Sequence, residues 1–290
     1  MKRYWLKWTG VATLAFALAA CGTDDGNNDG ASSEQNGETE GPASEETFTI
    51  GATQILEHPS LDAAYEGFKQ AIADAGLEVE FDFQSAQNDQ NNASAIANNF
   101  VANQVDLIFA NSTPSAQSAL QATNDIPILF TSVTNAVEGG LVSAMDEPGE
   151  NITGVVDLHP DAIENTVHFM DEYFSDAKVG IVYNAGEANS VAQMDEIAVA
   201  AEETTLELVS RTVASSSEVQ QAVSSLVSEV DILYVFTDNT VVSALETVIS
   251  EANSAEIPLI VGERIHWHEA VLRHSASTTI RSAIVRERWR

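Results

Sequence analysis

Short runs of apolar, β-branched and aromatic residues alternate with longer amphipathic segments from residue 48 to residue 261. The short runs cover residues 48–54, 77–83, 106–110 and 126–132 in the first half, and 178–184, 206–213, 231–236 and 257–261 in the second. The segments between them, such as residues 59–76, carry apolar side chains three and four positions apart, which predicts helices. Strands that alternate with helices in this way form a parallel sheet covered on both faces. The pattern therefore predicts an α/β protein.

One stretch of this pattern occurs twice. Residues 105–120 read VDLIFANSTPSAQSAL, and residues 230–245 read VDILYVFTDNTVVSAL. Each copy covers the third predicted strand of its half and the helix that follows. We therefore expect two similar doubly wound lobes, an N-terminal lobe over residues 47–155 and a C-terminal lobe over residues 156–263, joined by a hinge at the crossing near the sequence NITGVV.

Polar turns follow the predicted strands. They cover residues 53–59, 111–117 and 131–136 in the first lobe, and residues 183–190 and 236–240 in the second. Sheets of this class bind ligands at the carboxyl ends of their strands. We expect the two sets of turns to face each other across a cleft and to form a binding site there.

Two of the turns differ in a way that matters for binding. Thr113 is expected to cap a helix that has Pro114 at its first position, which would leave the backbone N–H groups of Ser115 and Ala116 free to bind a carboxylate. Asp238 stands at the equivalent point of the second lobe and offers a carboxylate instead. Donors on one wall and an acceptor on the other would match the two ends of an amino acid. The alternative is that Thr113 and Asp238 are helix caps only.

Other polar residues of the turns admit the same two interpretations. Glu187 and Asn189 could contact a ligand or stabilise the start of a helix, and His58 could be a cap. The sequence contains no Gly-rich phosphate loop, no Gly-x-Ser-x-Gly motif and no His-Glu-x-x-His motif. His58, His159 and His168 lack the spacing of metal ligands. We expect no enzyme activity, no metal site and no cofactor.

The net charge of the chain limits the classes of partner that it can bind. Its 290 residues include 44 Asp and Glu but only 12 Lys and Arg, so the formal net charge is −32. A polyanion of this strength repels phosphate backbones, which excludes a nucleic-acid partner. An acidic, Lys-poor surface is typical of halophile-like proteins, because salt screens the self-repulsion. An acidic surface without a special habitat is the alternative.

The N-terminus predicts export. Three basic residues precede an apolar segment over residues 10–20, which is too short to span a bilayer and indicates a signal peptide over residues 1–20. The sequence LAAC that ends at Cys21 resembles a bacterial lipobox, which implies that Cys21 carries a lipid and that the chain is anchored to the cell membrane from outside the cytoplasm. A retained membrane anchor is the alternative. Residues 21–46 contain few apolar side chains and predict a disordered acidic tether.

Several segments resemble a known family. The sequences IGATQILEHPSLDAAYEGFKQAI, VDLIFANSTPSAQSAL, NITGVVDL, YNAGEANSVAQ and YVFTDNTVVSALE are similar to substrate-binding lipoproteins of bacterial ABC importers, in the branch assigned to tryptophan and other aromatic amino acids. The likeness covers about residues 48–262. It implies a type I periplasmic-binding-protein fold that binds a small amino acid between two lobes and delivers it to ABC permease and ATPase subunits. The ligand contacts that it implies are Thr53, Gln54, Ser115, Ala116, Thr131, Thr134, Asn184, Glu187, Asn189 and Asp238.

The C-terminus departs from this family. Residues 264–290 hold six of the 12 Lys and Arg residues, where the family would continue with a Gly-containing turn, a strand and a final helix. We expect an aberrant basic tail, translated out of frame or truncated, which would leave the fold incomplete at this end. A genuine basic tail that binds a partner is the alternative. Two other functions also stay open for the whole chain, a ligand-binding sensor domain of a membrane receptor and a nonfunctional remnant.

Overall fold

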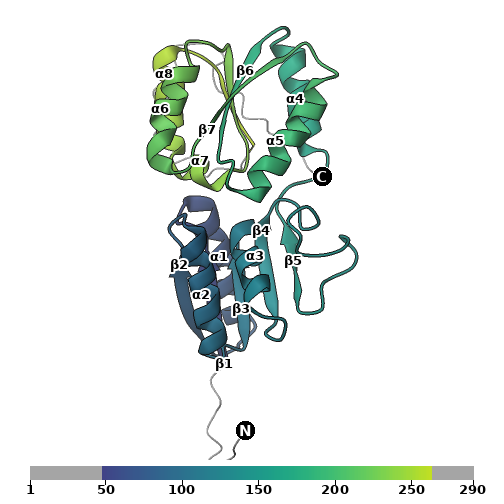
Figure 1. Cartoon of the computed structure of the whole chain (residues 1–290), viewed down its shortest axis with the longest axis vertical. Helices are drawn as coiled ribbons and strands as arrows, with labels where there is room; N and C mark the ends of the chain where they lie inside the picture. Colours follow the sequence, from purple (N-terminus) through teal and green to yellow (C-terminus); the bar gives the residue numbers. More distant parts are fainter. Residues whose placement is uncertain (1–47, 263–290) are drawn as a thin grey trace, which may run out of the picture. The chain divides into compact units, whose positions relative to one another are not determined.

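The computed structural model describes residues 48–262. The predicted signal peptide, Cys21, the acidic tether and the basic tail lie outside these residues. Within them, strands and helices alternate along the chain and form two separate parallel sheets, which confirms the predicted α/β class (Figure 1). None of the helices in this part of the chain is both long and apolar enough to cross a membrane.

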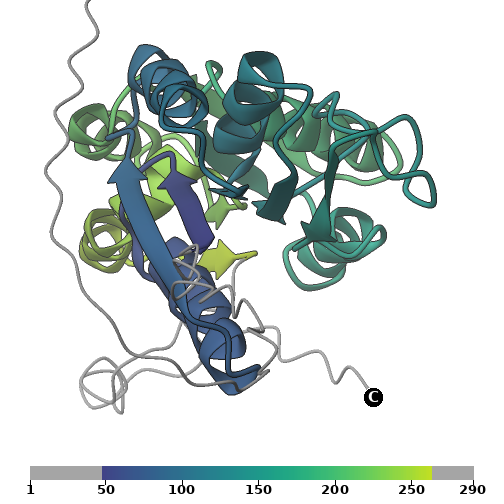
Figure 2. The same ribbon diagram turned by 90° about the horizontal axis from the view of Figure 1, so that it is seen from below.

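The first sheet has five parallel strands in the order β2-β1-β3-β4-β5. Its strands are β1 (Phe48–Gln54), β2 (Val79–Ser85), β3 (Leu107–Asn111), β4 (Ile128–Val133) and β5 (Ile152–Val156). Its helices are α1 (Pro59–Asp74), α2 (Gln90–Ala102) and α3 (Thr113–Ala122). Figure 2 shows α1 on one face of the sheet and α2 and α3 on the opposite face.

The second sheet repeats the first with one strand fewer, in the order β7-β6-β8-β9. Its strands are β6 (Lys178–Tyr183), β7 (Glu207–Thr212), β8 (Ile232–Val235) and β9 (Leu259–Val261). Its helices are α4 (Ala162–Tyr173), α5 (Ala188–Ala201), α6 (Ser216–Leu226), α7 (Asn239–Ser243) and α8 (Leu245–Ala255). In Figure 1, α4 and α5 lie on one side of this sheet, and α6 and α8 lie on the other.

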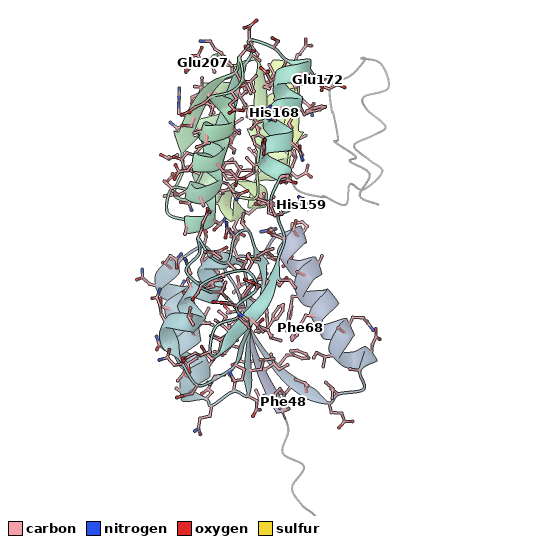
Figure 3. The ribbon with its side chains drawn as sticks, turned by 90° about the vertical axis from the view of Figure 1, so that its right-hand side faces the viewer. Phe48, Phe68, His159, His168, Glu172 and Glu207 are labelled. Carbon is pink, nitrogen blue, oxygen red and sulfur yellow. The ribbon has the colours of Figure 1, made fainter. Side chains whose placement is uncertain are left out.

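The predicted crossing near NITGVV lies directly after this segment, which itself belongs to the first sheet. The segment contains β5, which pairs in parallel with β4 as the last strand of the first sheet. Gly154 lies opposite Phe130 in this pair, and a Cβ at position 154 would approach the Phe130 carbonyl oxygen to 2.1 Å, so this close pairing requires glycine. The chain therefore leaves the first sheet after Val156. His159, which Figure 3 labels, lies in the connecting segment.

The repeated Val-Asp pair performs the same structural task in both lobes. The Asp106 carboxylate accepts a hydrogen bond from the backbone N–H of Thr49 at 2.7 Å, and the Asp231 carboxylate accepts one from the N–H of Lys178 at 2.8 Å. In each lobe this bond joins the start of the third strand to the start of the first. The repeat therefore aligns β3 with β1 and β8 with β6 in the same way.

Each sheet has a separate apolar core on each of its faces. In the first lobe, α2 and α3 bury side chains such as Phe100 against one face, while Tyr65 of α1 packs on the other. Phe68 of α1 stacks on Phe109 of β3 with ring centroids 4.0 Å apart, and Figure 3 shows Phe68 between the helix and the sheet. Among the described residues, α1 is the only helix on this face, and Val155 at its far edge is 63% exposed.

Gly51 in β1 provides a direct test of the packing between β1 and α2. A Cβ at this position would lie 2.7 Å from the Phe100 ring, which is fully buried. We expect Gly51→Ala to lower the free energy of unfolding by about 1–3 kcal/mol, because the core would be overpacked. The measurement is urea unfolding followed by circular dichroism.

Gly67→Ala is the matched control. Gly67 lies in α1 with no heavy atom within 4 Å of its added Cβ, so alanine should raise the free energy of unfolding by about 0.5–1 kcal/mol. Equal effects of the two substitutions would contradict the packing of Phe100 against Gly51.

Candidate functional site

The strand order places the candidate site at one edge of each sheet. Between β1 and β3, and again between β6 and β8, neighbouring strands lead to helices on opposite faces, and ligands bind at the carboxyl ends of such strands. Thr53 and Gln54 end β1, and both are buried. Asn111 ends β3 and donates hydrogen bonds to the Gln54 side-chain oxygen at 3.1 Å and to the Leu61 carbonyl at 2.7 Å. This buried amide network fixes the end of β1 against the start of α1.

The equivalent edge of the second sheet is organised by Asp238. One of its carboxylate oxygens accepts a hydrogen bond from the backbone N–H of Asn184 at 2.6 Å, and the other accepts one from the N–H of Val241 at 2.8 Å. The second bond makes Asp238 the N-cap of α7. Asp238 is therefore a cap that also joins the end of β6 to the start of α7, which supports the capping interpretation of this residue.

Glu187 points toward the same helix start. Its carboxylate accepts hydrogen bonds from the Thr240 hydroxyl at 2.7 Å, from the backbone N–H of Thr240 at 3.2 Å and from the backbone N–H of Asn239 at 3.3 Å. The Asn184 side chain donates to Thr240 at 2.8 Å and completes the cluster. The first turn of α7 thus has two buried carboxylates at its N-terminus, where the helix dipole favours negative charge.

The environment of Asp238 changes its protonation. Burial and the charge of Glu187 raise the pKa of Asp238 to about 7, and the hydrogen bonds from Asn184 and Val241 only partly oppose this shift. Burial is the larger of these two causes, because it withdraws the charged carboxylate from water. Near neutral pH, the cluster around Asp238 therefore exchanges a proton with solvent.

The start of α3 differs from the prediction for Thr113, Ser115 and Ala116. The N-cap is Ser112, whose hydroxyl accepts a hydrogen bond from the N–H of Ser115 at 3.3 Å, and the N–H of Ala116 donates to the Ser112 carbonyl at 3.0 Å. The expectation that these two N–H groups are free to bind a carboxylate is therefore wrong. Ser115 and Ala116 are fully buried, and the Thr113 hydroxyl is buried without a hydrogen-bond partner.

Backbone strain marks the same edge of the first sheet. Ser112 has a φ of 131° and a ψ of 160°, a region in which glycine is the usual residue, and Ser132 has a φ of 54°. Ser112 directly follows β3, and Ser132 is the residue before the last in the neighbouring strand β4. Strained residues cluster at functional sites, so this observation agrees with a site at the carboxyl ends of β3 and β4.

A small polar cavity lies between the turns of the two lobes. It has a volume of about 30 Å³, which is enough for a water-sized group. Two predicted contacts, Thr134 and Asn189, line it. The other lining residues are Ser60, Leu61, Ser132, Asp157, Thr237 and Asn239.

The remaining predicted contacts do not line this cavity. Thr53, Gln54, Asn184, Glu187 and Asp238 are buried at the strand ends and helix starts described above. Thr131 is half-buried at the end of β4, and its carbonyl accepts a hydrogen bond from the N–H of Ser112.

Sequence analysis missed several residues of the cavity, and for different reasons. Ser132, Thr237 and Asn239 stand in turns that were recognised, but nothing in the sequence ranked them above their neighbours. Asp157 follows β5, and the apolar run of that strand was the signal that could have found it. Its backbone N–H donates to the Val133 carbonyl at 3.0 Å, which holds it beside the end of β4.

His58 is a further buried polar residue, at the start of α1. It precedes Pro59 at the start of α1 but makes no side-chain cap, and neither ring nitrogen has a partner at hydrogen-bond distance. Burial lowers the pKa of His58, although the nearby Asn239 side chain and the Asp62 carboxylate oppose the shift. His58 is therefore a neutral imidazole at neutral pH.

Two hydrogen bonds join the lobes around the cavity. The Asn88 side chain of the first lobe donates to the Thr240 hydroxyl of the second at 2.9 Å. The hydroxyls of Thr134 and Thr237 lie 3.5 Å apart. Among the described residues there is no group of three or more His, Cys, Asp or Glu that could hold a metal ion.

Comparisons with known proteins identify relatives of this fold. Residues 49–266 match the family described as ABC transporter substrate binding protein. The chain is 42% identical over 251 residues to a tyrosine-binding protein of Clostridioides difficile (strain R20291), and the match covers 85% of this chain and 70% of that one.

Two solved structures are similar to the described lobes. The first is an ABC domain in complex with L-Trp from Streptococcus pneumonia, at 32% identity and a TM-score of 0.69, over 74% of each chain. The second is a ligand-free, open structure of a substrate-binding protein with adhesive properties from Clostridium difficile, at 40% identity and a TM-score of 0.51, also over 74% of each chain. The fold, the extent of the family match and the identity to the curated relative agree: the chain belongs to the ABC transporter substrate-binding protein family, whose members bind a ligand for transport and are not enzymes.

Proposed function

We propose that this chain binds an aromatic amino acid, tyrosine or tryptophan, between its two lobes and delivers it to the permease of an ABC importer. The observation that carries the proposal is the similarity to a tyrosine-binding protein at 42% identity, together with the similarity to a structure in complex with L-Trp. The polar cavity between the turns of both lobes supports the proposal, because residues of both lobes line it. Cys21 would carry the lipid anchor, and the acidic tether would hold the lobes outside the cytoplasm.

Binding requires the lobes to move. A cavity of about 30 Å³ is much smaller than an aromatic amino acid, so the ligand must enter when the lobes are further apart. The relative in the ligand-free, open state has the higher identity but the lower TM-score, while the relative with bound L-Trp has the lower identity but the higher TM-score. This contrast supports a closed arrangement of the lobes in the present structure. The bond between Asn88 and Thr240 would belong to that closed state.

The predicted contacts would then divide into two groups. Thr134 and Asn189 line the cavity and would contact the ligand directly. Gln54, Asn184, Glu187 and Asp238 would shape its walls, because their polar groups are bonded to backbone and side chains around the strand ends. Asp238 would thus act as a positioning residue of the second lobe.

Calorimetric titration of the chain tests the proposed ligand class. L-tyrosine, L-tryptophan, L-phenylalanine and L-leucine should be compared at equal concentrations. We expect saturable heat from tyrosine or tryptophan and weaker or absent heat from leucine, because an aliphatic side chain buries less surface. Absence of heat from all of the aromatic amino acids would refute the proposal.

Substitution of Asn88 tests the closure of the two lobes without changing a residue that is proposed to contact the ligand. Its backbone has a φ of 62°, so Asn88→Gly keeps the left-handed conformation and removes only the hydrogen bond to Thr240. We expect the affinity for the amino acid to fall by about 2- to 10-fold, which corresponds to one hydrogen bond. The control is Gln87→Gly at the neighbouring left-handed position, where φ is 54°. Equal affinities of the two variants would contradict a role of Asn88 in closure.

Asp238→Asn tests the buried carboxylate pair through its pH dependence. A carboxyl whose pKa is raised from 3.8 to about 7 in the folded state stabilises the fold below pH 3.8, and this contribution is lost as the pH rises through about 7. Between pH 4 and pH 8, the unfolding free energy of the native chain should therefore fall relative to that of the variant by at least about 1 kcal/mol.

Asp195→Asn is the matched control for this titration, because Asp195 is an exposed carboxylate on α5. This variant should show the same fall in unfolding free energy between pH 4 and pH 8 as the native chain, because it keeps Asp238. Parallel pH curves for the native chain and the Asp238→Asn variant would show that Asp238 keeps an ordinary pKa.

A further inference from the structure

Several side chains that line the cavity offer hydrogen-bond acceptors. Asn189 is 6% exposed, and its side-chain oxygen is buried without a partner. The orientation of this amide is determined by its nitrogen, which faces the Thr237 carbonyl at 3.2 Å, the Ser190 hydroxyl at 3.4 Å and the Glu187 carboxylate at 3.5 Å. The oxygen of Asn189 is therefore left as a buried acceptor without a partner, on a residue that lines the cavity.

Two of the hydroxyl groups that line the cavity, those of Ser132 and Thr237, are also left as acceptors. The Ser132 hydroxyl donates its proton to the Asn111 side-chain oxygen at 2.8 Å. The Thr237 hydroxyl donates to the Gln193 side-chain oxygen at 2.7 Å. Because a hydroxyl has one proton, both oxygens can only accept a hydrogen bond from a ligand.

Asp157 adds a negative charge to this set of acceptors. The described part of the chain contains three Lys and Arg residues, and each lies within 4 Å of a glutamate elsewhere: Lys69 of Glu66, Lys178 of Glu207 and Arg211 of Glu229. None of these cations is paired with Asp157. Surrounding protein raises the pKa of the Asp157 carboxyl by withdrawing part of it from water, although the residue keeps an exposed surface. A cation that enters the cavity would offset this desolvation.

Asp238, which the sequence suggested as the acceptor for one end of an amino acid, and its neighbour Glu187 are already engaged. All four of their carboxylate oxygens accept hydrogen bonds within the second lobe, mostly from the first turn of α7. Neither residue lines the cavity. A ligand ammonium would therefore meet Asp157 and Asn189 instead.

We propose that Asp157 and the side-chain oxygen of Asn189 bind the primary ammonium group of the ligand when the lobes close. The inference rests on the proposed function and adds the residues that recognise the amino group. A cavity of about 30 Å³ is of the size of one ammonium group, whose three N–H donors match the acceptors from both lobes. Asp157 comes from the segment after β5 and Asn189 from α5, so their shared ligand would couple binding to closure.

The test is a calorimetric comparison of three ligands that share one ring. L-tyrosine has both charged groups, tyramine has only the ammonium, and 3-(4-hydroxyphenyl)propionate has only the carboxylate. We expect Asp157→Asn to weaken the binding of tyrosine and tyramine by about tenfold or more, because a charged partner is lost, and to leave the propionate unchanged or improved. Asn189→Ala should weaken the same two ligands and spare the propionate.

Asp161→Asn is the control, since Asp161 is an exposed carboxylate four residues further along the same segment. It should bind all three ligands as the native chain does. Thermal unfolding of each variant reports its folding, and Asp157→Asn should not lower the unfolding temperature because Asp157 has no cationic partner among the described residues. Titrations in sodium chloride and in choline chloride should agree, because an organic ammonium and not a sodium ion occupies the acceptors.

Three outcomes would overturn the inference. Equal weakening of tyrosine and the propionate by Asp157→Asn would indicate a general structural role. Unchanged tyrosine binding by this variant would place the ammonium elsewhere and would leave the proposed function intact. Loss of binding in choline chloride would assign the acceptors to sodium. If the native chain binds tyramine but no aromatic amino acid, the ammonium site stands and the proposed function fails.

Discussion

Parallel strand pairing is the constraint on which the candidate site depends. In each sheet it brings the carboxyl ends of all strands to one edge, and the order of the strands places two helix starts on opposite faces beside that edge. The loops after β1, β3, β4 and β5 therefore meet, as do the loops after β6 and β8. Buried polar networks then hold these loops, with Asn111 as the centre in the first lobe and Asp238 in the second.

The two lobes share this geometry but have different side chains at their helix starts. The aspartates of the repeated Val-Asp pair join equivalent strands in both lobes. At the helix starts the copies diverge, because the first lobe caps α3 with a neutral serine while the second caps α7 with a carboxylate and adds Glu187. Buried negative charge is therefore concentrated at the wall of the second lobe, where it is satisfied by N–H groups. The charge that remains available to a ligand lies on Asp157 instead.

Much of the fold could be predicted from the sequence, because apolar runs of strand length alternate with helical periodicity. The predicted strand over residues 48–54 has the bounds of β1, and the duplicated stretch lies on the third strand of each lobe. The strand β5 was not recognised, since its glycine and its exposed Val155 obscure the pattern of a buried strand. Because β5 was not predicted, Asp157, the residue that follows it, was not predicted as part of the site either.

The candidate site was harder to predict than the fold. Two adjacent hydroxyl residues, Ser112 and Thr113, could each cap α3, and the choice depends on the unusual backbone of Ser112, which no local pattern indicates. Whether a carboxylate faces a ligand or a helix start likewise depends on three-dimensional neighbours, as Asp238 illustrates. Turn positions were thus predictable, whereas the direction of each polar group was not.

A crystal structure of the chain grown with L-tyrosine would examine the central claim most directly. We predict that the amino acid lies between the two sets of strand ends, with its nitrogen at hydrogen-bond distance from Asp157 and Asn189 and with Asp238 still bonded to the start of α7. A ligand bound outside this gap, or one whose nitrogen contacts Asp238 in place of Asp157, would contradict it.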